Sequence, residues 1–126
     1  MRFRDIKIVE ANKGSGEVRY NTELAMLTAF AGGTDLNNIP DEALSDPKKV
    51  KSEIKKVSSY YNDKKFQQWL NISNMYKEKI KTHSGSLPTK YNWVAGENQG
   101  DVADLVFVDH PASGISIKDD SGITLA

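Results

Sequence analysis

The hydrophobic pattern of the chain changes period near His83–Ser86, and this change limits the available folds more than any other feature. Before this point, apolar residues recur every three or four positions, as they do on the buried face of a helix. After it, short runs rich in Ile, Val, Phe, Tyr and Trp alternate with turn residues, as they do in strands. The order predicts a single α+β domain over residues 1–126, with N-terminal helices followed by a mixed or antiparallel β-meander.

Capping and turn residues set the expected element boundaries. The Lys13–Gly16 segment indicates a break, so Asn21 or Thr22 is the expected N-cap of the first helix. A short amphipathic strand is expected over Phe3–Val9, and the Tyr60–Asp63 segment is the expected bend between two later helices. The helices are predicted over 17–31, from 47 to this bend and over 64–81, and the strands over 91–95, 103–108, 115–118 and 123–125.

Composition excludes several classes of protein. The chain has no cysteine, so it can form neither a disulfide framework nor a cysteine-ligated zinc site. No apolar run approaches the roughly 20 residues that a membrane span requires, and the N-terminal residues lack the apolar core of a secretory signal. We therefore expect a soluble intracellular protein that has no membrane partner.

Charge is distributed unevenly, although the formal net charge is zero. The segment from Pro47 to Lys81 has ten lysines and three acidic residues, a net charge of +7, so the remaining residues carry −7. A phosphate-binding surface beside a carboxylate-rich metal site would produce this split, and so would a solvated lysine-rich helix. The predicted phosphate contacts are Lys48, Lys51, Lys55 and Lys56, with Tyr60, Tyr61 and Asn62 as candidate contacts to sugars or bases.

Two neighbouring runs near the C-terminal end combine charged and apolar residues. The first is GDVADLVFV, residues 100–108, and the second is GISIK, residues 114–118. An acid at the start of an apolar strand is uncommon without a partner, which makes Asp104 a candidate functional residue. Strand side chains alternate with period two, so Ser116 and Lys118 are expected to share one face, while Ile115 packs into the core.

These two runs resemble the PD-(D/E)XK, or restriction-endonuclease-like, superfamily, in which an Asp begins one strand and a (D/E)-x-K triplet lies on the neighbouring strand. Asp104 matches the first acid and Lys118 matches the lysine. The resemblance implies a restriction-endonuclease-like core that hydrolyses DNA phosphodiester bonds with Mg²⁺, or Mn²⁺, as cofactor. It also implies a location in the cytoplasm of a bacterial or phage-infected cell.

The resemblance assigns catalytic roles to residues of both runs. Asp104 would bind the metal, and Lys118 would position or activate the attacking water. Ser116 stands where the superfamily has its second acid, and serine is a poor metal ligand. The variant with serine at this position is similar to forms met among type II restriction enzymes.

Glu23 is the expected source of the missing carboxylate. It shares a helical stripe with Leu27 and Phe30, so it is predicted to face inward, an unusual direction for a carboxylate without a function. An additional acid on an early helix is also known in many members of the superfamily. Other candidates for the missing carboxylate are Asp101, Asp119 and Asp120, and the predicted metal ligands are Asp104, Glu23 and Asp101.

Ordinary structural explanations stay open for the same residues. Asp101 would serve equally to cap the turn that precedes the first run, and His110 before Pro111 is expected in a turn. Lys118 would serve equally as a surface lysine at a strand end, and Glu23 as a solvated helix carboxylate.

The superfamily core has a helix, and usually another strand, after the lysine-bearing strand, whereas this chain ends eight residues past Lys118. We therefore expect a core that is incomplete at the C-terminus, either as a fragment of a longer enzyme or completed by a partner chain or in a homodimer. The main functional hypothesis is a Mg²⁺-dependent DNA endonuclease. The alternatives are a non-catalytic nucleic-acid-binding module, and a structural subunit that has kept the nuclease-like fold.

Overall fold

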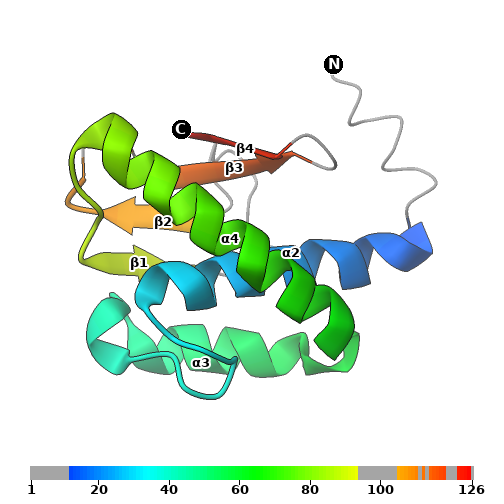
Figure 1. The fold of residues 1–126 in the computed structure, drawn as a ribbon. Helices are drawn as coiled ribbons and strands as arrows, with labels where there is room; N and C mark the ends of the chain where they lie inside the picture. Colours follow the sequence, from blue (N-terminus) through cyan, green and yellow to red (C-terminus); the bar gives the residue numbers. More distant parts are fainter. Residues whose placement is uncertain (1–11, 94–104, 111, 113, 119–121, 126) are drawn as a thin grey trace.

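A computed structural model describes residues 12–93, 105–110, 112, 114–118 and 122–125, with side chains described for 18–93, 105–110, 112 and 114–115. Helices come first and strands last, which confirms the predicted α+β order (Figure 1). The helices are α2 (Asn12–Ala31), α3 (Pro47–Lys56) and α4 (Asp63–Ser84), with short 3₁₀ turns η1 (Asp41–Ala43) and η2 (Ser58–Tyr60). The strands are β1 (Lys90–Asn92), β2 (Leu105–Val108), β3 (Gly114–Lys118) and β4 (Gly122–Leu125).

The four strands form an antiparallel meander in the order β1-β2-β3-β4. Asn92 of β1 lies opposite Val106 of β2, and Leu105 of β2 lies opposite Ile115 of β3. Strands that follow one another in the sequence are antiparallel neighbours, so this order needs no crossover connection. Of the two arrangements that the sequence left open, mixed or antiparallel, the sheet therefore has the antiparallel one.

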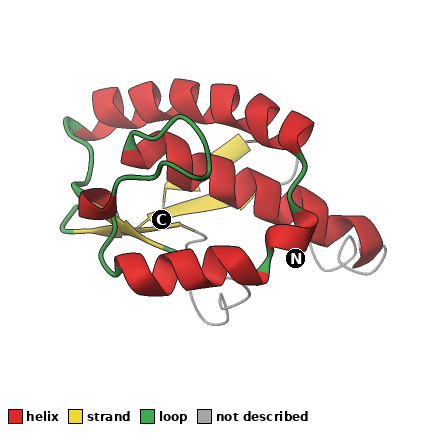
Figure 2. Cartoon of the chain, turned by 90° about the horizontal axis from the view of Figure 1, so that it is seen from below, coloured by secondary structure: helices red, strands yellow, loops and turns green. Residues whose placement is uncertain are grey.

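Helix α2 occupies the centre of the molecule. Every residue from 21 to 31 is buried, as expected for a helix that has neighbours on several sides. α4 packs along one side of α2, and the sheet and α3 lie beyond the other side (Figure 2). The Phe30 ring of α2 contacts the rings of Tyr91 and Phe107, with centroid distances of 6.1 and 6.2 Å, so this helix carries the contact with the first two strands.

The start of α2 differs from the prediction. The helix begins at Asn12 and continues through Gly14 and Gly16, so Asn21 and Thr22 lie inside it and cap nothing. A glycine inside a helix costs only about 1 kcal/mol relative to alanine, and burial of the following turns outweighs that cost. The predicted strand over Phe3–Val9 lies outside the described residues.

The other described helix boundaries have capping residues of the usual kinds. Asp46 accepts a hydrogen bond from the Lys49 amide at 3.2 Å and precedes a proline in the first turn of α3. Asn62 caps α4 in the same way, through a 3.0 Å bond from the Lys65 amide. Gly32 follows the last residue of α2 with a φ of 89°, a left-handed conformation that glycine adopts without a steric penalty.

Helical spacing in the sequence predicts one buried stripe of Val50, Ile54, Val57 and Tyr61 and a second of Phe66, Trp69, Leu70, Met75 or Tyr76, and Ile80, and both are confirmed in part. Val50 and Val57 of the first stripe are buried, but Tyr61 is 37% exposed, because the chain turns into α4 at this point and the helical repeat ends. In the second stripe the sequence left open whether Met75 or Tyr76 faces inward. Met75 is 63% exposed and Tyr76 packs against the core, so Tyr76 takes the inward position.

Candidate functional site

Strands β2 and β3, which contain parts of the two chemically informative runs, are neighbours in the sheet. Leu105, Phe107 and Ile115 are buried, which confirms the predicted inward position of Ile115. Leu105 pairs with Ile115 and Val106 pairs with Gly114. The two runs that the resemblance requires on adjacent strands are therefore on adjacent strands.

The predicted catalytic residues of these runs are described to different extents. Ser116 and Lys118 lie in β3, where their backbones pair with Thr124 and Gly122 of β4, but their side chains are outside the described set. Asp104 directly precedes β2 and lies outside the described residues. The same holds for the other acidic candidates, which are Asp101, Asp119 and Asp120. Convergence of Asp104 and Lys118 on one point therefore stays a prediction.

Glu23 faces inward, as predicted. Its residue is 3% exposed, beside Leu27 at 0% and Phe30 at 4% on the same stripe of α2. The Trp93 indole Nε1–H donates to Glu23 Oε1 at 2.7 Å, and Arg19 Nε donates to Oε2 at 3.0 Å. The carboxylate is thus held on both oxygens, and the adjacent guanidinium offsets part of the cost of burying its charge.

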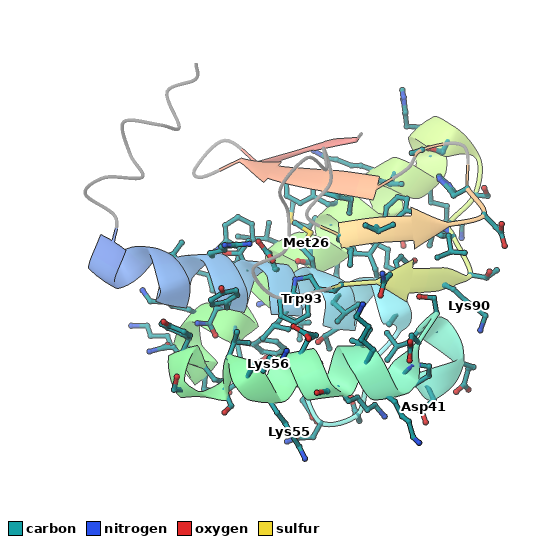
Figure 3. All side chains as sticks on the ribbon, turned by 180° about the vertical axis from the view of Figure 1, so that it is seen from behind. Met26, Asp41, Lys55, Lys56, Lys90 and Trp93 are labelled. Carbon is teal, nitrogen blue, oxygen red and sulfur yellow. The ribbon has the colours of Figure 1, made fainter. Side chains whose placement is uncertain are left out.

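The contact with Trp93 places Glu23 at a definite end of the sheet. Trp93 directly follows β1, and its side chain is 1% exposed among α2, α3 and the strands (Figure 3). Because β1 and β2 are antiparallel and Asn92 lies opposite Val106, the end of β1 lies beside the start of β2. Glu23 therefore lies near the end of the sheet at which β2 begins, and Asp104 is the residue before β2.

The two partners of Glu23 were not foreseen from the sequence. Arg19 precedes Glu23 by four residues, a spacing that brings helical side chains together, so this ion pair had a readable signal. Trp93 is separated from Glu23 by 70 positions, and no spacing rule connects them. Only the closure of the meander against α2 brings the indole to the carboxylate.

The four predicted DNA-binding lysines of α3 and its C-terminal end differ in their surroundings. Lys51 forms an ion pair with Asp41, and Lys56 forms one with Glu53 at 2.8 Å. Lys48 and Lys55 are exposed and form no ion pair with any described residue, and Lys55 points away from the rest of the molecule (Figure 3). These two lysines are the better placed of the four to meet phosphate oxygens.

Some lysines of the basic segment instead support the fold. Lys77 Nζ donates to the Ala29 carbonyl oxygen at 3.1 Å, near the end of α2. The last carbonyl groups of a helix carry partial negative charge, so an ammonium group is stabilising there.

His110 is likewise structural, as expected for a turn residue. Its Nδ1 accepts from the Ala112 amide at 3.1 Å, and its Nε2 lies 3.1 Å from the Ser86 carbonyl oxygen, which fits a neutral ring protonated on Nε2.

Burial changes the acid–base behaviour of two tyrosines near the strands and the α3–α4 junction. Burial raises the pKa of Tyr91 to about 12. The pKa of Tyr61 is also raised to about 12, first by burial and then by the hydrogen bond that its hydroxyl donates to Asp63 and by nearby negative charge. Both phenols therefore stay neutral through the pH range in which most proteins work.

The part of the chain that the structure describes contains no group of three or more His, Cys, Asp or Glu side chains arranged to hold a metal ion. Glu23 is the one predicted metal ligand whose side chain is described.

No helix among the described residues is long and apolar enough to cross a lipid bilayer. Comparison with known proteins found no match to a family model, to a curated protein or to a solved structure.

Proposed function

We propose that this chain is a metal-dependent DNA endonuclease that uses Asp104 and Glu23 as metal ligands and Lys118 as the cationic catalytic residue. The observation that supports the proposal is the antiparallel pairing of β2 with β3 in the register Leu105 to Ile115. The resemblance requires its two runs on neighbouring strands, and β2 and β3 are such neighbours. In the sequence Asp104 directly precedes Leu105, and Ser116 directly follows Ile115.

The chemistry requires oxygen ligands, a cation and an attacking water. A bound Mg²⁺ or Mn²⁺ ion would supply Lewis acidity and lower the pKa of a coordinated water. Carboxylate oxygens of Asp104 and Glu23 are the hard ligands that such ions prefer. The Lys118 ammonium would stabilise charge on the phosphate oxygens while the water oxygen bonds to phosphorus and the bond from phosphorus to the leaving oxygen breaks. Ser116 would donate a hydrogen bond to the phosphate in place of a second acid.

Two described donors contact the carboxylate of Glu23. The Trp93 indole donates to Oε1 and the Arg19 guanidinium donates to Oε2. The two donors also fix the orientation of the carboxylate before a metal arrives. A preoriented ligand loses less conformational entropy when the ion binds.

DNA as the substrate gives a function to the exposed lysines of α3. Lys48 and Lys55 would neutralise phosphates of the bound DNA. DNA as substrate also favours the cytoplasm as the location. A second copy, or a completing chain, would pair with β4, which has no neighbour on its outer side among the described strands.

Cleavage of supercoiled plasmid DNA tests the proposal directly. We expect the wild-type protein to nick or cut the plasmid when Mg²⁺ or Mn²⁺ is added and to leave it intact in the presence of a chelator. Asp104→Asn and Lys118→Ala should each lower the cleavage rate by about 100-fold or more, since each removes a group that stabilises the transition state. The measurement is the rate of loss of the supercoiled band, with all proteins purified identically.

Two matched variants separate the site from the general effect of each substitution. Asp109→Asn makes the same chemical change as Asp104→Asn, five residues later, at a left-handed position with a φ of 56° that asparagine tolerates. Lys90→Ala removes an exposed lysine from another strand, where its ammonium group donates to the Glu42 carbonyl oxygen. Both variants should cut at the wild-type rate. An inactive wild-type protein, or equal cutting by Asp104→Asn, would contradict the nuclease proposal.

One observation favours a second candidate, a non-catalytic DNA-binding module. The Glu23 carboxylate already has a buried tryptophan and an arginine as partners, an arrangement that also serves structure alone. A binding module would show salt-sensitive affinity for DNA that responds neither to Mg²⁺ nor to Asp104→Asn. The plasmid assay combined with a binding titration distinguishes the two candidates.

A further inference from the structure

Two neighbouring tyrosines are exposed where α3 meets α4. Tyr60, at the end of η2, is 43% exposed, and Tyr61 is 37% exposed. Tyrosine side chains usually bury most of their ring, so two consecutive exposed rings are uncommon without a ligand. The Tyr61 hydroxyl donates to Asp63 at 2.8 Å, and its ring packs on Phe66 at a centroid distance of 5.4 Å. Tyr60 is the freer of the two rings.

A stack of groups from α2 supports the Tyr60 ring. The Tyr20 ring lies 5.2 Å from the Tyr60 ring between centroids, at an interplanar angle of 44°. The Arg19 guanidinium lies 5.1 Å from the centroid of the Tyr20 ring. The Arg19 guanidinium, the Tyr20 ring and the Tyr60 ring thus lie side by side, and the Tyr60 ring remains partly exposed to solvent. We call Tyr60, Tyr20 and Arg19, together with the lysines Lys55 and Lys64, the junction surface.

The exposed ring is not what holds the junction together. The Asn21 side chain donates to the backbone carbonyl of Tyr60 at 2.8 Å, and its Oδ1 accepts from the Asn62 amide at 2.9 Å. These bonds fix the backbone on both sides of Tyr61 without using the Tyr60 ring. Asn62 also caps α4 through its Oδ1, so this side chain has a structural role, and its predicted base contact stays a prediction.

Two exposed lysines flank the junction surface in the sequence. Lys55 and Lys64 are exposed, lie within five positions of Tyr60 in the sequence, and form no ion pair with any described residue. Three acids lie near the junction: Glu53 pairs with Lys56 at 2.8 Å, Asp63 accepts from Tyr61, and Asp35 accepts from the Asn37 amide and adds negative charge near Tyr61. The surface therefore offers an aromatic face together with lysines that form no ion pair with a described residue, a combination suited to a nucleic-acid strand.

We propose that the junction surface binds an unpaired segment of DNA, with Tyr60 stacked on a base and Lys55 and Lys64 on the flanking phosphates. Duplex DNA keeps its bases stacked on each other, so an exposed ring contributes affinity only where a base is free. The inference deepens the proposed function by naming the form of the substrate, and it rests on DNA being that substrate. Binding is measured without metal, so it is tested apart from cleavage.

The test is fluorescence anisotropy of a fluorescein-labelled oligothymidylate titrated with the full chain in a chelator. We expect the single strand to bind more tightly than a duplex of equal length. Tyr60→Ala should weaken binding of the single strand by about tenfold, because one base–aromatic stack is lost. Lys55→Ala should reduce the slope of log affinity against log salt concentration by about 0.7, the value for one phosphate contact on a single strand.

Three control variants accompany this titration. Tyr60→Phe keeps the ring and should bind as the wild type does. Met75→Ala removes another exposed apolar side chain, 63% exposed on α4, and should have no effect. Lys90→Ala removes a lysine from the strand side of the molecule and should leave the salt slope unchanged. Circular dichroism and thermal melting of each variant show whether it is folded.

Equal affinity of Tyr60→Ala and wild type would overturn the inference, as would tighter binding of the duplex or no binding at low salt. If the plasmid is cut while Tyr60→Ala binds normally, the nuclease proposal stands and the junction surface does not. If single-strand binding depends on Tyr60 while the plasmid stays intact, the surface stands and the nuclease proposal fails.

Discussion

Two buried glutamates have similar ion pairs but differ in how far along the chain their hydrogen-bond partners lie. Glu23 on α2 and Glu53 on α3 are 3% and 7% exposed, and each pairs with a cation about one helical turn away. The Glu23 carboxylate also accepts from Trp93, across 70 positions of sequence, whereas the Glu53–Lys56 pair joins residues near the end of one helix. The Trp93 bond therefore connects the central helix to the end of β1, and the Lys56 bond connects α3 to its own C-terminal end.

The comparison shows why a buried acid is not by itself a sign of catalysis. Both carboxylates are buried, and the Trp93 bond places Glu23 near the end of the sheet at which β2 begins. One variant removes the Trp93 indole N–H from Glu23, and another removes the Lys56 ammonium group from Glu53. Their free energies of unfolding measure how strongly the fold depends on each donor.

The largest effect is expected from Trp93→Phe. The variant keeps an aromatic ring but removes the indole N–H, so Glu23 Oε1 loses a donor at a site that water does not reach. A hydrogen bond to a buried charged group contributes about 1.5–3 kcal/mol, and we expect the free energy of unfolding in urea to fall by about that amount. A loss below about 0.5 kcal/mol would show that Glu23 does not depend on the indole.

Glu23→Gln sharpens this prediction. Glutamine keeps an oxygen that accepts from Trp93 but removes the negative charge that strengthens this bond, so Trp93→Phe should cost less in the Glu23→Gln background, and the double variant should lose less than the sum of the two single variants. Additive losses would mean that the charge of Glu23 does not strengthen the indole bond.

A change of pH is expected to have an effect of intermediate size on stability, through Tyr91 at the contact between α2 and β1. Burial raises the pKa of Tyr91 to about 12, against an ordinary value of 10.0. The neutral phenol is therefore favoured in the folded state, and its contribution is complete below pH 10 and is lost as pH rises from 10 to 12. We expect wild-type stability to fall by roughly 1 kcal/mol more than that of Tyr91→Phe between pH 9 and pH 11. Urea titrations at the two pH values measure the difference.

Tyr61→Phe is the control for this measurement. The pKa of Tyr61 is also raised to about 12, but the residue is 37% exposed, so solvent screening reduces its effect on stability. If Tyr61→Phe removed more of the alkaline loss than Tyr91→Phe, the sensitivity would belong to the α3–α4 junction and not to the contact between α2 and β1.

Elements with a strong local signal were predictable from the sequence. Asp46 and Gly32 mark helix ends through their own side-chain or backbone chemistry, and the strand runs have the apolar alternation that a sheet requires. The start of α2 was not predictable, because two glycines and the polar residues Asn21 and Thr22 suggested a later beginning. Burial of the helix on several sides, which a local pattern does not contain, outweighed those signals.

The candidate site was predictable to a smaller extent. The inward direction of Glu23 followed from the stripe that it shares with Leu27 and Phe30, and the structure confirms it. The partner of its carboxylate did not follow, because the Trp93 contact depends on how the meander closes against α2. The roles of Asp104, Ser116 and Lys118 come from the resemblance and remain predictions.

The smallest effect is expected from Lys56→Ala, which removes the local donor of Glu53. The Lys56 side chain is 64% exposed, so its attraction to the carboxylate is screened by water and by salt. We expect a loss of at most about 0.5 kcal/mol in the same urea assay, and a smaller loss when sodium chloride is added. Lys49→Ala, which removes an exposed lysine of α3 that forms no ion pair with a described residue, is the matched control. If Lys56→Ala cost as much as Trp93→Phe, the two carboxylates would depend equally on their donors, and the contrast between a bond across the fold and a local bond would be wrong.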